Sequence, residues 1–365
     1  MAGSTFGTHF KIMTWGESHG KGVGVVVDGC PAGLELSEKD IQIFLDRRKP
    51  GNSRYATPRK EEDCVEIFSG VFEGKTTGTP ISMAVWNKTQ RSKDYSEIAK
   101  MYRPGHADLT YDLKYGFRDY RGGGRSSGRE TIGRVAAGAI AVKILNQLGI
   151  TFTTYTKAIG PISIETFCKD EILKNVLYMP DEKAAKEAEK YLEKCMSEGD
   201  SSGGVIECVI HGMIPGIGEP VFEKLSANLA KAICSIGAVK GFEIGDGMMA
   251  ARGKGSENND AYGLGEDGKP KKKTNHSGGI LGGISDGSDV IFRAAVKPTP
   301  SIFSTQQTVT NDGKEIDLNI KGRHDPIIVP RAVVVVEAMA ALTVLDLLLT
   351  SMTSRMEYLV HFFQS

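Results

Sequence analysis

The chain has 365 residues, of which 40% are hydrophobic and 25% are charged, so it is long enough to bury a large core. Lysine plus arginine equals aspartate plus glutamate at 45 each, which excludes a global positive field of the kind that attracts nucleic acid. The positive charge is local instead, and short basic stretches in a neutral chain suit small polyanionic ligands. The N-terminal residues do not resemble a signal or transit peptide, and the cysteines show no CxxC spacing, so we expect reduced thiols in a cytoplasmic protein.

The first part of the chain predicts several strands and one capped helix. Strands are expected over residues 7–15, 23–27, 64–72 and 80–87. Ser37 and Asp40 predict a helix start, and that helix is expected to continue to about Arg48. The turn between the first two strands carries His19, which on its own would be interpreted as a surface histidine. Residues 45–60 hold six basic residues against one acidic residue and form the first basic stretch.

Residues 88–120 are polar, irregular and contain six aromatic residues. An irregular segment of that length in a compact chain is usually functional or disordered, and the aromatic content argues against disorder. Within it, the Arg-Pro-Gly-His sequence at 103–106 places a second histidine, His106, beside a rigid turn.

Residues 121–134 form the second basic stretch, with three consecutive glycines and four arginines against Glu130 alone. Ser127 and Glu130 predict a capping box, and the helix that follows is expected to end near Gly149. Cations are unfavourable at the positive end of a helix dipole, whereas a bound anion reverses that sign. We therefore expect a phosphate or carboxylate site here rather than a solvated basic loop. The small residues from Ala136 to Ala141 predict that this helix packs in the interior.

The second half of the chain predicts a further set of strands and helices. An exposed amphipathic helix is expected over 182–197, another helix over about 219–235, and strands over 204–211, 239–244 and 289–296. Residues 253–275 are rich in lysine, glycine and asparagine and predict a mobile loop. The apolar run from Ala332 to Leu349 is interrupted by Glu337, Thr343 and Asp346, so it predicts a buried core helix rather than a membrane span.

Two polar turns precede this terminal helix. Lys297–Ser301 is stiffened by prolines and offers lysine, threonine and serine donors that suit phosphate, although a polar turn alone would explain them. Gly322–Pro326 contains Arg-His-Asp, and Arg331 follows just before the helix. Two regions of the chain thus share one plan, a glycine or proline turn, then basic residues, then a buried helix. This plan is compatible with an internal duplication.

Taken together, these segments resemble the chorismate synthase family over nearly the full length of the chain. The segments that carry the resemblance are Gly16–Gly20, Arg47–Arg54, Arg103–His106, 121–134, Lys297–Ser301, Gly322–Pro326 and Glu337–Met339. One departure is Gly128, where many members have alanine, and both residues are small. The resemblance implies a single α+β domain over 1–365, a sandwich of long helices packed between antiparallel β-sheets, and assembly as a homotetramer.

The resemblance also implies a reaction. Members of the family are lyases that convert 5-enolpyruvylshikimate 3-phosphate to chorismate, the last step of the shikimate pathway. The reaction is a 1,4-anti elimination of phosphate and a C6 hydrogen, and it needs reduced FMN (FMNH2) although no net redox change occurs. The substrate carries two carboxylates and a phosphate, and FMN adds another phosphate. Clustered arginines suit such ligands because each guanidinium can bind an oxyanion bidentately.

By the same resemblance, five residues are expected to act in catalysis. His19 would protonate the departing phosphate, and His106 would protonate or stabilise the reduced flavin. Asp325 would accept the proton from flavin N5, because burial and neighbouring charges can tune a carboxylate for that task. Ser18 and Ser127 would relay or orient this proton.

The other expected site residues bind the substrate and the cofactor. The substrate, or NADP, would be held by Arg48, Arg54, Arg129 and Arg134. FMN would be contacted by Arg125, Ser126, Ser127, Gly237, Ala238, Gly282, Lys297, Pro298, Thr299, Pro300, Ser301 and Arg323. No set of metal ligands is expected. Without the resemblance, Asp325 would instead be interpreted as a structural salt bridge to Arg323.

Two other functions remain open on the residues alone. Gly245–Ala250 matches the dinucleotide fingerprint G-x-G-x-x-A, which would suit an NAD(P)-dependent oxidoreductase, but no crossover helix is expected after it. The two basic stretches with nearby tyrosines would suit an RNA-binding protein, but the zero net charge and the lack of a nucleic-acid motif count against it. We expect neither a nucleic-acid partner nor a membrane. Because the chain is of the shorter, bacterial type, the resemblance implies no flavin reductase activity of its own, so that NADPH acts only indirectly through a separate reductase.

Overall fold

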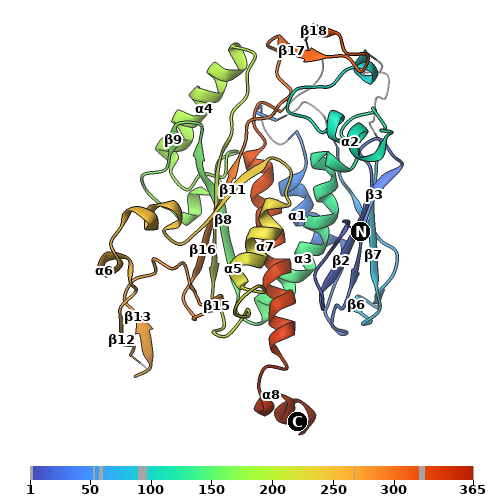
Figure 1. Ribbon diagram of the computed structural model, residues 1–365. Helices are drawn as coiled ribbons and strands as arrows, with labels where there is room; N and C mark the ends of the chain where they lie inside the picture. Colours follow the sequence, from blue (N-terminus) through green and yellow to red (C-terminus); the bar gives the residue numbers. More distant parts are fainter. Residues whose placement is uncertain are drawn as a thin grey trace.

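The computed structural model describes residues 3–51, 54–56, 61–88, 97–266, 268–319 and 325–364. Two five-stranded antiparallel sheets face each other with helices packed between them, which confirms the predicted α+β sandwich (Figure 1). The first sheet has the order β1 (Thr5–Phe6), β2 (Lys11–Gly16), β3 (Gly22–Asp28), β7 (Ile81–Trp86) and β4 (Val65–Ile67). The second has the order β11 (Val239–Ile244), β16 (Val290–Val296), β10 (Gly204–His211), β8 (Thr151–Ile159) and β9 (Ile162–Ser163).

Four helices fill the space between the sheets in Figure 1: α1 (Glu38–Arg48), α3 (Thr131–Gln147), α5 (Leu225–Cys234) and α7 (Val329–Ser351). Helix α3 packs on β3 and on α7, while α7 also packs on β8 and β10. The start of α1 agrees with its prediction, since Asp40 accepts hydrogen bonds from the backbone nitrogen and the hydroxyl of Ser37 at 2.8 and 2.9 Å. The long helices are apolar on all sides because protein surrounds them.

The topology of the two halves supports the internal duplication. In the first half, β2, β3, α1, β4, a short hairpin, β7 and α3 follow one another, and the strands lie in the order β2-β3-β7-β4. In the second half, β8, β10, α5, β11, a short hairpin, β16 and α7 follow in the same sequence, and the strands lie in the order β8-β10-β16-β11. As a consequence, α3 and α7 occupy equivalent positions and lie side by side.

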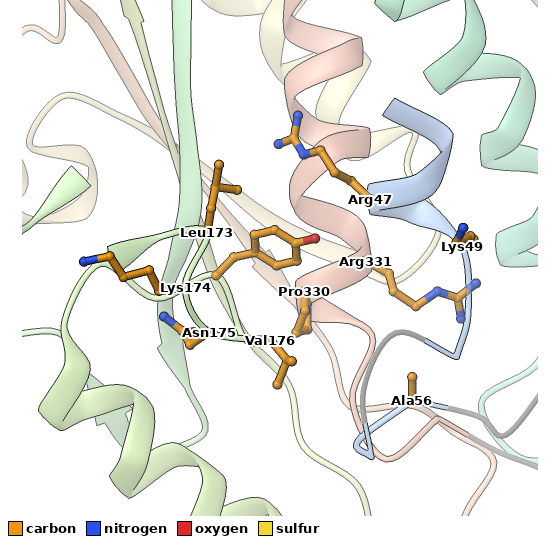
Figure 2. Close-up of a pocket in the computed structure, with 10 residues that line it drawn as sticks. Arg47, Lys49, Ala56, Leu173, Lys174, Asn175, Val176, Pro330 and Arg331 are labelled. Carbon is orange, nitrogen blue, oxygen red and sulfur yellow. The ribbon is translucent and has the colours of Figure 1, made fainter. Parts of the chain in front are cut away.

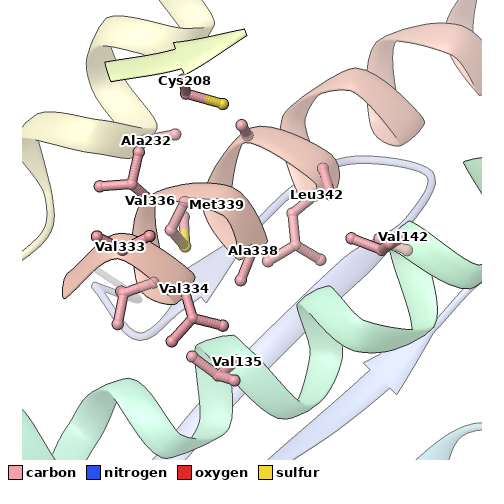
Figure 3. Close-up of a cluster of buried hydrophobic side chains, with 14 of the residues drawn as sticks. Val135, Val142, Cys208, Ala232, Val333, Val334, Val336, Ala338, Met339 and Leu342 are labelled. Carbon is pink, nitrogen blue, oxygen red and sulfur yellow. The ribbon is translucent and has the colours of Figure 1, made fainter. Parts of the chain in front are cut away.

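Close contact between α3 and α7 depends on small residues. A Cβ on Gly138 would lie only 2.3 Å from Cβ of Ala338, so a larger residue at 138 would force the helices apart. Figure 3 shows the valines of α3 facing α7, while β10 and α5 cover the other side of α7. The prediction that α3 is an interior helix is confirmed.

Helix α7 is long and apolar enough to cross a membrane, but 83% of its most apolar window is buried inside the molecule. Each polar residue that interrupts the run has a partner. Glu337 binds both terminal nitrogens of Arg47, and the hydroxyl of Thr343 donates to the carbonyl oxygen of Met339 at 2.8 Å. Asp346 accepts hydrogen bonds from three successive backbone nitrogens at residues 8–10. The prediction of a buried core helix is therefore confirmed.

Several predicted boundaries are corrected by the structure. The strand predicted over 7–15 begins at Lys11, because the backbone at 8–10 binds Asp346. The strand predicted over 64–72 is split into β4 and β5 (Val71–Phe72), and the helix predicted from 219 begins at Leu225. The irregular segment 88–120, described from residue 97 onward, contains α2 (Asp108–Tyr115). The amphipathic helix predicted over 182–197 is present as α4 (Glu182–Ser197).

The loop predicted over 253–275 is also wrong in part. This segment contains α6 (Gly255–Asn258) and a hairpin of β12 (Tyr262–Leu264) and β13 (Pro270–Lys272). Lys272 at the end of the hairpin is buried and pairs with Asp260 at 3.2 Å and Asp286 at 2.8 Å. A lysine-rich composition predicts exposure, but here distant carboxylates neutralise the buried charge.

The remaining elements lie outside the two large sheets. They are the helix α8 (Met356–Gln364) and the strands β5 (Val71–Phe72), β6 (Lys75–Thr76), β14 (Ile280–Leu281), β15 (Ile284–Ser285), β17 (Gln306–Val309) and β18 (Glu315–Leu318). The hairpin β17–β18 lies near α2, at the end of the molecule where α3 and α7 begin (Figure 1).

Candidate active site

The loops that carry most of the predicted site residues gather where α3 and α7 begin, the upper end in Figure 1. Arg48, the last residue of α1, joins the two helix starts. Its Nη1 donates to the carbonyl oxygen of Gly128 at 3.3 Å, and its own carbonyl oxygen accepts from Nε of Arg331 at 3.1 Å. Two helix N-termini therefore open toward one region, an arrangement that favours a bound anion.

His19 is buried between the β2–β3 turn and the glycine-rich loop. A Cβ on Gly122 would lie 2.5 Å from Nδ1 of His19, and Gly122 has a φ of +82°, so only glycine allows this contact. Oγ of Ser18 lies 3.2 Å from the same Nδ1 atom. The residues alone predicted a surface histidine, and this is wrong because the glycine-rich loop covers the ring.

Arg125 connects the glycine-rich loop to the end of β2. Its Nη1 donates to the carbonyl oxygen of Gly16 at 3.1 Å, and its Nη2 donates to the carbonyl oxygen and the hydroxyl of Thr14 at 3.1 and 2.7 Å. The neighbouring Ser126 donates within the loop, to the carbonyl oxygen of Gly123 at 2.6 Å. The loop is thus fixed against the first sheet by its own arginine.

The predicted capping box at Ser127 and Glu130 does not form. Oγ of Ser127 accepts from the backbone nitrogen of Arg129 at 3.3 Å and starts a 3₁₀ turn, and α3 begins only at Thr131. Glu130 reaches the sheet instead, where its Oε1 accepts from the hydroxyl of Thr14 at 2.9 Å. Glu130 therefore binds a residue that is distant in the chain instead of completing the predicted capping box.

One buried carboxylate joins two of the predicted substrate arginines. Oδ2 of Asp63 lies 2.5 Å from Nη2 of Arg48, and Oδ1 lies 2.9 Å from Nη1 of Arg129. The side chain of Asp63 is 0% exposed and that of Arg48 is 2% exposed. Burial alone would raise the pKa of Asp63, but the charges of Arg48 and Arg129 outweigh it and hold this pKa below its ordinary value.

Asn87 connects this arginine pair to the turn that carries His19. Its Oδ1 accepts a hydrogen bond from Nε of Arg129, and its Nδ2 donates to the carbonyl oxygens of Glu17 at 3.0 Å and Gly20 at 2.9 Å. Glu61 also pairs with Arg129. Arg129 of the second basic stretch is therefore paired with two carboxylates and an amide, which argues against a solvated basic loop at this position.

His106 lies against the turn 297–301. Its Nε2 lies 3.0 Å from Oγ of Ser301, and Nζ of Lys297 donates to the carbonyl oxygen of Gly105 at 2.9 Å. The backbone nitrogen of Lys297 in turn donates to the carbonyl oxygen of Ala238 at 2.9 Å. Three predicted segments that are distant in sequence, around 106, 238 and 299, thus meet at one place.

The turn of His106 is anchored by a buried ion pair. Asp108 accepts from the backbone nitrogen of Arg103 at 3.0 Å and from its Nε and Nη2 at 2.8 Å each, and the same Nη2 donates to the carbonyl oxygen of Gly122 at 3.3 Å. Arg103 thus links the turn of His106 to the loop that covers His19. Burial, followed by the positive charge of Arg103, lowers the pKa of His106 to about 4, so its imidazole is neutral at pH 7.

Asp325 lies just before α7 and pairs with Arg331 at 2.7 Å. Because Arg331 also donates to the backbone of Arg48, Asp325 is tied to the arginine pair. The carbonyl oxygen of Pro326 accepts from the backbone nitrogen of Ser202 at 3.0 Å, which holds this segment against the second sheet.

A pocket of about 220 Å³ adjoins the site at Arg331 (Figure 2). It is lined by Arg47, Lys49, Ala56, Leu173, Lys174, Asn175, Val176, Tyr178, Pro330 and Arg331. Each of its four cations is paired: Arg47 with Glu337, Arg331 with Asp325, and both lysines with carboxylates three residues earlier in the chain. The charges of its lining are thus already balanced by neighbouring carboxylates.

Two of the predicted substrate arginines lie apart from the Arg48–Arg129 pair. Arg134 pairs with Glu130 at 2.9 Å and donates to Oγ of Ser235 at 2.6 Å, beside the predicted cofactor residues 237–238. Arg54 is exposed and pairs with Glu193 of α4 at 2.7 Å. The four arginines that were predicted to bind the substrate therefore do not all lie together in the structure.

Gly282 also lies apart from the other cofactor residues. It is in the turn between β14 and β15, near the start of β16, whereas Lys297 follows the end of β16. A strand of that length spans about 20 Å. Within a single subunit, Gly282 and the turn 297–301 therefore lie at opposite ends of β16. The predicted cofactor residue Arg323 lies outside the described residues, and with it the alternative salt bridge to Asp325.

Several residues of this site were missed by sequence reasoning, namely Asp63, Glu61, Asn87, Arg103, Asp108 and Arg331 as contact residues. The acidic run Glu61–Asp63 directly follows the first basic stretch and was the available signal for the counter-ions. Nothing comparable in the sequence marks Asn87, whose role depends on the pairing of β7 with β3.

The structure also decides the dinucleotide alternative. Gly245–Ala250 follows β11, a strand of an antiparallel sheet, and leads into a 3₁₀ segment over Gly247–Arg252 rather than a crossover helix. It therefore lacks the context of a dinucleotide-binding fold. All six cysteines are free thiols, and in the part of the chain that the structure describes no group of three or more histidine, cysteine or acidic side chains is arranged to hold a metal ion.

The comparisons with known proteins agree on one family. The profile of the family described as chorismate synthase matches residues 10–349. A chorismate synthase of Agathobacter rectalis is 68% identical over 366 residues and covers 100% of both chains. One of Methanosarcina mazei is 56% identical and covers 96% of this chain and 97% of its own. A solved structure, titled as the crystal structure of chorismate synthase, has a TM-score of 0.77 at 31% identity and covers 98% of this chain and 97% of its own.

Proposed function

Since the chain belongs to the chorismate synthase family, whose members convert 5-enolpyruvylshikimate 3-phosphate to chorismate, we propose that its substrate and reduced FMN bind where α3 and α7 begin. One observation carries the proposal. A continuous series of contacts runs from Asp325, through Arg48 and Arg129, to the turn of His19 and, through Arg103, to His106. Acid, base and anion-binding groups from separate parts of the chain meet in this series.

Arg48 and Arg129 hold anionic groups of the substrate. Nε of Arg48 is a buried donor without a hydrogen-bond partner among the residues that the structure describes, so a bound oxyanion would supply an acceptor. In the same part of the chain, Nη2 of Arg129 has no partner either, because Nε binds Asn87 and Nη1 binds the two carboxylates. Glu61 competes with the substrate for Arg129 and must yield part of that contact when the substrate binds.

The turn Lys297–Ser301 and the segment of Ala238 hold FMN. The hydroxyl of Thr299 is buried without a partner within the described ranges, so it offers a donor that fits a phosphate oxygen. Ala238 has a φ of +72°, and its carbonyl oxygen accepts from the backbone nitrogen of Lys297 in this turn. When bound, reduced FMN supplies the electron density that assists the loss of phosphate, and it is returned unchanged.

The hydrogen-bond partners of the histidines suggest their roles. A carbonyl oxygen only accepts, so Nδ1 of His106, which lies 2.9 Å from the carbonyl oxygen of Pro104, carries the hydrogen, and Nε2 accepts from Ser301. His106 therefore stabilises or protonates the reduced flavin only after an anion nearby has raised its pKa. To act as the acid, His19 is an imidazolium whose Nδ1 donates to Oγ of Ser18, while its Nε2 gives its proton to the departing phosphate and leaves a neutral ring.

Asp325 accepts the proton that the reaction releases at the flavin. Its pairing with Arg331 holds the carboxylate at the start of α7. The competing interpretation, a purely structural ion pair, is separated by two variants. For a proton acceptor, Asp325→Asn lowers kcat at unchanged melting temperature. For a structural ion pair, Asp325→Asn and Arg331→Ala lower the melting temperature alike and change kcat little.

An anaerobic assay of phosphate release with photoreduced FMN tests the proposed function. We expect release of phosphate and chorismate with reduced FMN and none with oxidised FMN. We also expect no chorismate in air with NADPH and oxidised FMN as the only additions, because we propose that the chain has no flavin reductase activity. Phosphate release at an equal rate without any flavin would contradict the proposal, and aerobic turnover with NADPH would contradict its second part.

The first sheet carries an apolar outer face that supports self-association. Met13, Trp15 and Trp86 point to the same face, where Trp86 contacts Phe68, and all four side chains are exposed. We propose that the chain forms a homotetramer in the cytoplasm and that Gly282 reaches a cofactor site only from a second subunit. Sedimentation of the wild type against Trp15→Glu measures the assembly, and a monomeric wild type would contradict it.

A further inference from the structure

The strongest feature that the proposed function does not use is the bridge formed by Asp63. Its two oxygens bind one nitrogen each of Arg48 and Arg129, at 2.5 and 2.9 Å. These arginines come from α1 and from the 3₁₀ turn before α3, 81 positions apart in the chain. No other carboxylate among the described residues contacts both of them.

The backbone at Asp63 has an unusual conformation. Asp63 has a φ of +49°, in the left-handed region, where aspartate and asparagine are tolerated better than most residues. Asp63 lies just before β4, and its carboxylate is buried, with 0% exposure, while Cys64 beside it is exposed. A strained residue that aims a buried charge at two arginines is a costly arrangement for a loop.

We propose that Asp63 is a positioning residue for the substrate, which sets the distance and orientation of the Arg48 and Arg129 guanidinium groups so that both bind the same polyanion. The inference rests on the proposed function, in which these two arginines hold the substrate. By using Nη2 of Arg48 and Nη1 of Arg129, the bridge leaves Nε of the first and Nη2 of the second for the ligand. It also separates two like charges that would otherwise repel each other.

The role of Asp63 differs from that of Glu61, although both contact Arg129. Among the described residues Glu61 contacts one arginine, Arg129, and it is 15% exposed, so its loss frees a donor on Arg129 without removing the bridge. Asp63 contacts both arginines and is fully buried. Its loss therefore removes the carboxylate that fixes the two guanidinium groups relative to each other. We therefore expect the loss of Asp63, but not the loss of Glu61, to raise the KM of the substrate.

Steady-state kinetics of Asp63→Asn test the inference. Asparagine has the same shape and tolerates the same backbone conformation, but it lacks the charge that both arginines require. We expect the KM for 5-enolpyruvylshikimate 3-phosphate to rise about ten-fold or more with kcat changed less than about three-fold, the pattern of lost binding rather than lost chemistry. Glu61→Gln is expected to leave KM unchanged or to lower it. The matched control is Asp46→Asn, which removes a charge from α1 but not from the bridge, and its KM is expected to stay within about two-fold.

A double-mutant cycle separates positioning from general damage. If Asp63 acts through Arg129, the KM of Asp63→Asn combined with Arg129→Lys is close to that of Arg129→Lys alone, whereas independent effects multiply. An unchanged KM in Asp63→Asn, or multiplying effects, overturns the inference and leaves the proposed function intact. An unchanged KM in Arg129→Lys instead overturns the proposed function. Should Asp63→Asn fail to fold, Asp63→Glu keeps the charge but displaces it by one methylene, and a wild-type KM for that variant overturns the inference as well.

Discussion

Nε2 of His106 lies 3.0 Å from Oγ of Ser301, although 195 positions separate the two residues in the chain. This contact is the point where the long polar segment of the first half meets the proline-stiffened turn of the second half. The other histidine of the site, His19, does not lie at this turn but against the glycine-rich loop. The two imidazoles therefore lie against different segments at one end of the molecule.

The titration of His106 is the first prediction. Burial and then Arg103 lower its pKa to about 4 in the folded protein, against about 6.5 in an unfolded chain. Between these values the unfolded state binds more protons, so the stability associated with this group is complete above pH 6.5 and is lost as the pH falls toward 4. We expect an NMR titration of the ligand-free protein to show neutral His106 down to about pH 5. A pKa near 6.5 would contradict the burial that the structure shows.

Turnover of histidine variants is the second prediction. His19→Ala and His106→Ala are each expected to lower kcat by about ten-fold or more, within the usual contribution of general acid–base groups. The control is His9→Ala, because His9 is exposed and contacts α7 through its backbone nitrogen rather than its ring. Unchanged rates for both site variants in the anaerobic assay would remove their assigned roles.

Asn87 provides the third prediction. It binds Arg129 through its oxygen and the turn of His19 through its nitrogen, so in the proposed function it would couple substrate binding to the position of the acid. We expect Asn87→Ala to raise the KM of the substrate and to lower kcat together, with kcat/KM reduced by about ten-fold or more. Asn87→Asp keeps the acceptor for Arg129 but loses the donor, so mainly kcat is expected to fall. Equal kinetics of wild type and Asn87→Ala would show that this link is not used.

Helix packing provides the fourth prediction. Gly138→Ala places a methyl group 2.3 Å from Cβ of Ala338, so α3 and α7 must move apart, at a cost of about 1–3 kcal/mol. Gly128→Ala is the matched control, since a Cβ there has nothing within 4 Å, and its stability is expected to be unchanged. Urea unfolding of the two variants measures the difference. Equal free energies of unfolding would mean that the helices do not constrain each other.

Local rules predicted much of the architecture correctly. The buried character of α7 follows from an apolar run that a few polar residues interrupt, and the start of α1 follows from Ser37 and Asp40, because both properties depend on residues within one or two helical turns. The boundaries that failed depend on distant partners. The strand β2 begins later than predicted because Asp346 binds residues 8–10. The hairpin at 262–272 ends at a buried lysine whose charge is neutralised by Asp260 and Asp286.

By itself, the sequence determined which residue types are available for chemistry: two histidines in turns, arginines beside glycines, and a helix start that suits an anion. The tertiary structure decided which of them meet. It joined Arg48 to Arg129 through Asp63, while Arg54 and Gly282 lie elsewhere. The physical reason is that charge and turn propensity act over a few residues, whereas the pairing of buried charges is set by packing between elements that the chain brings together only when it folds.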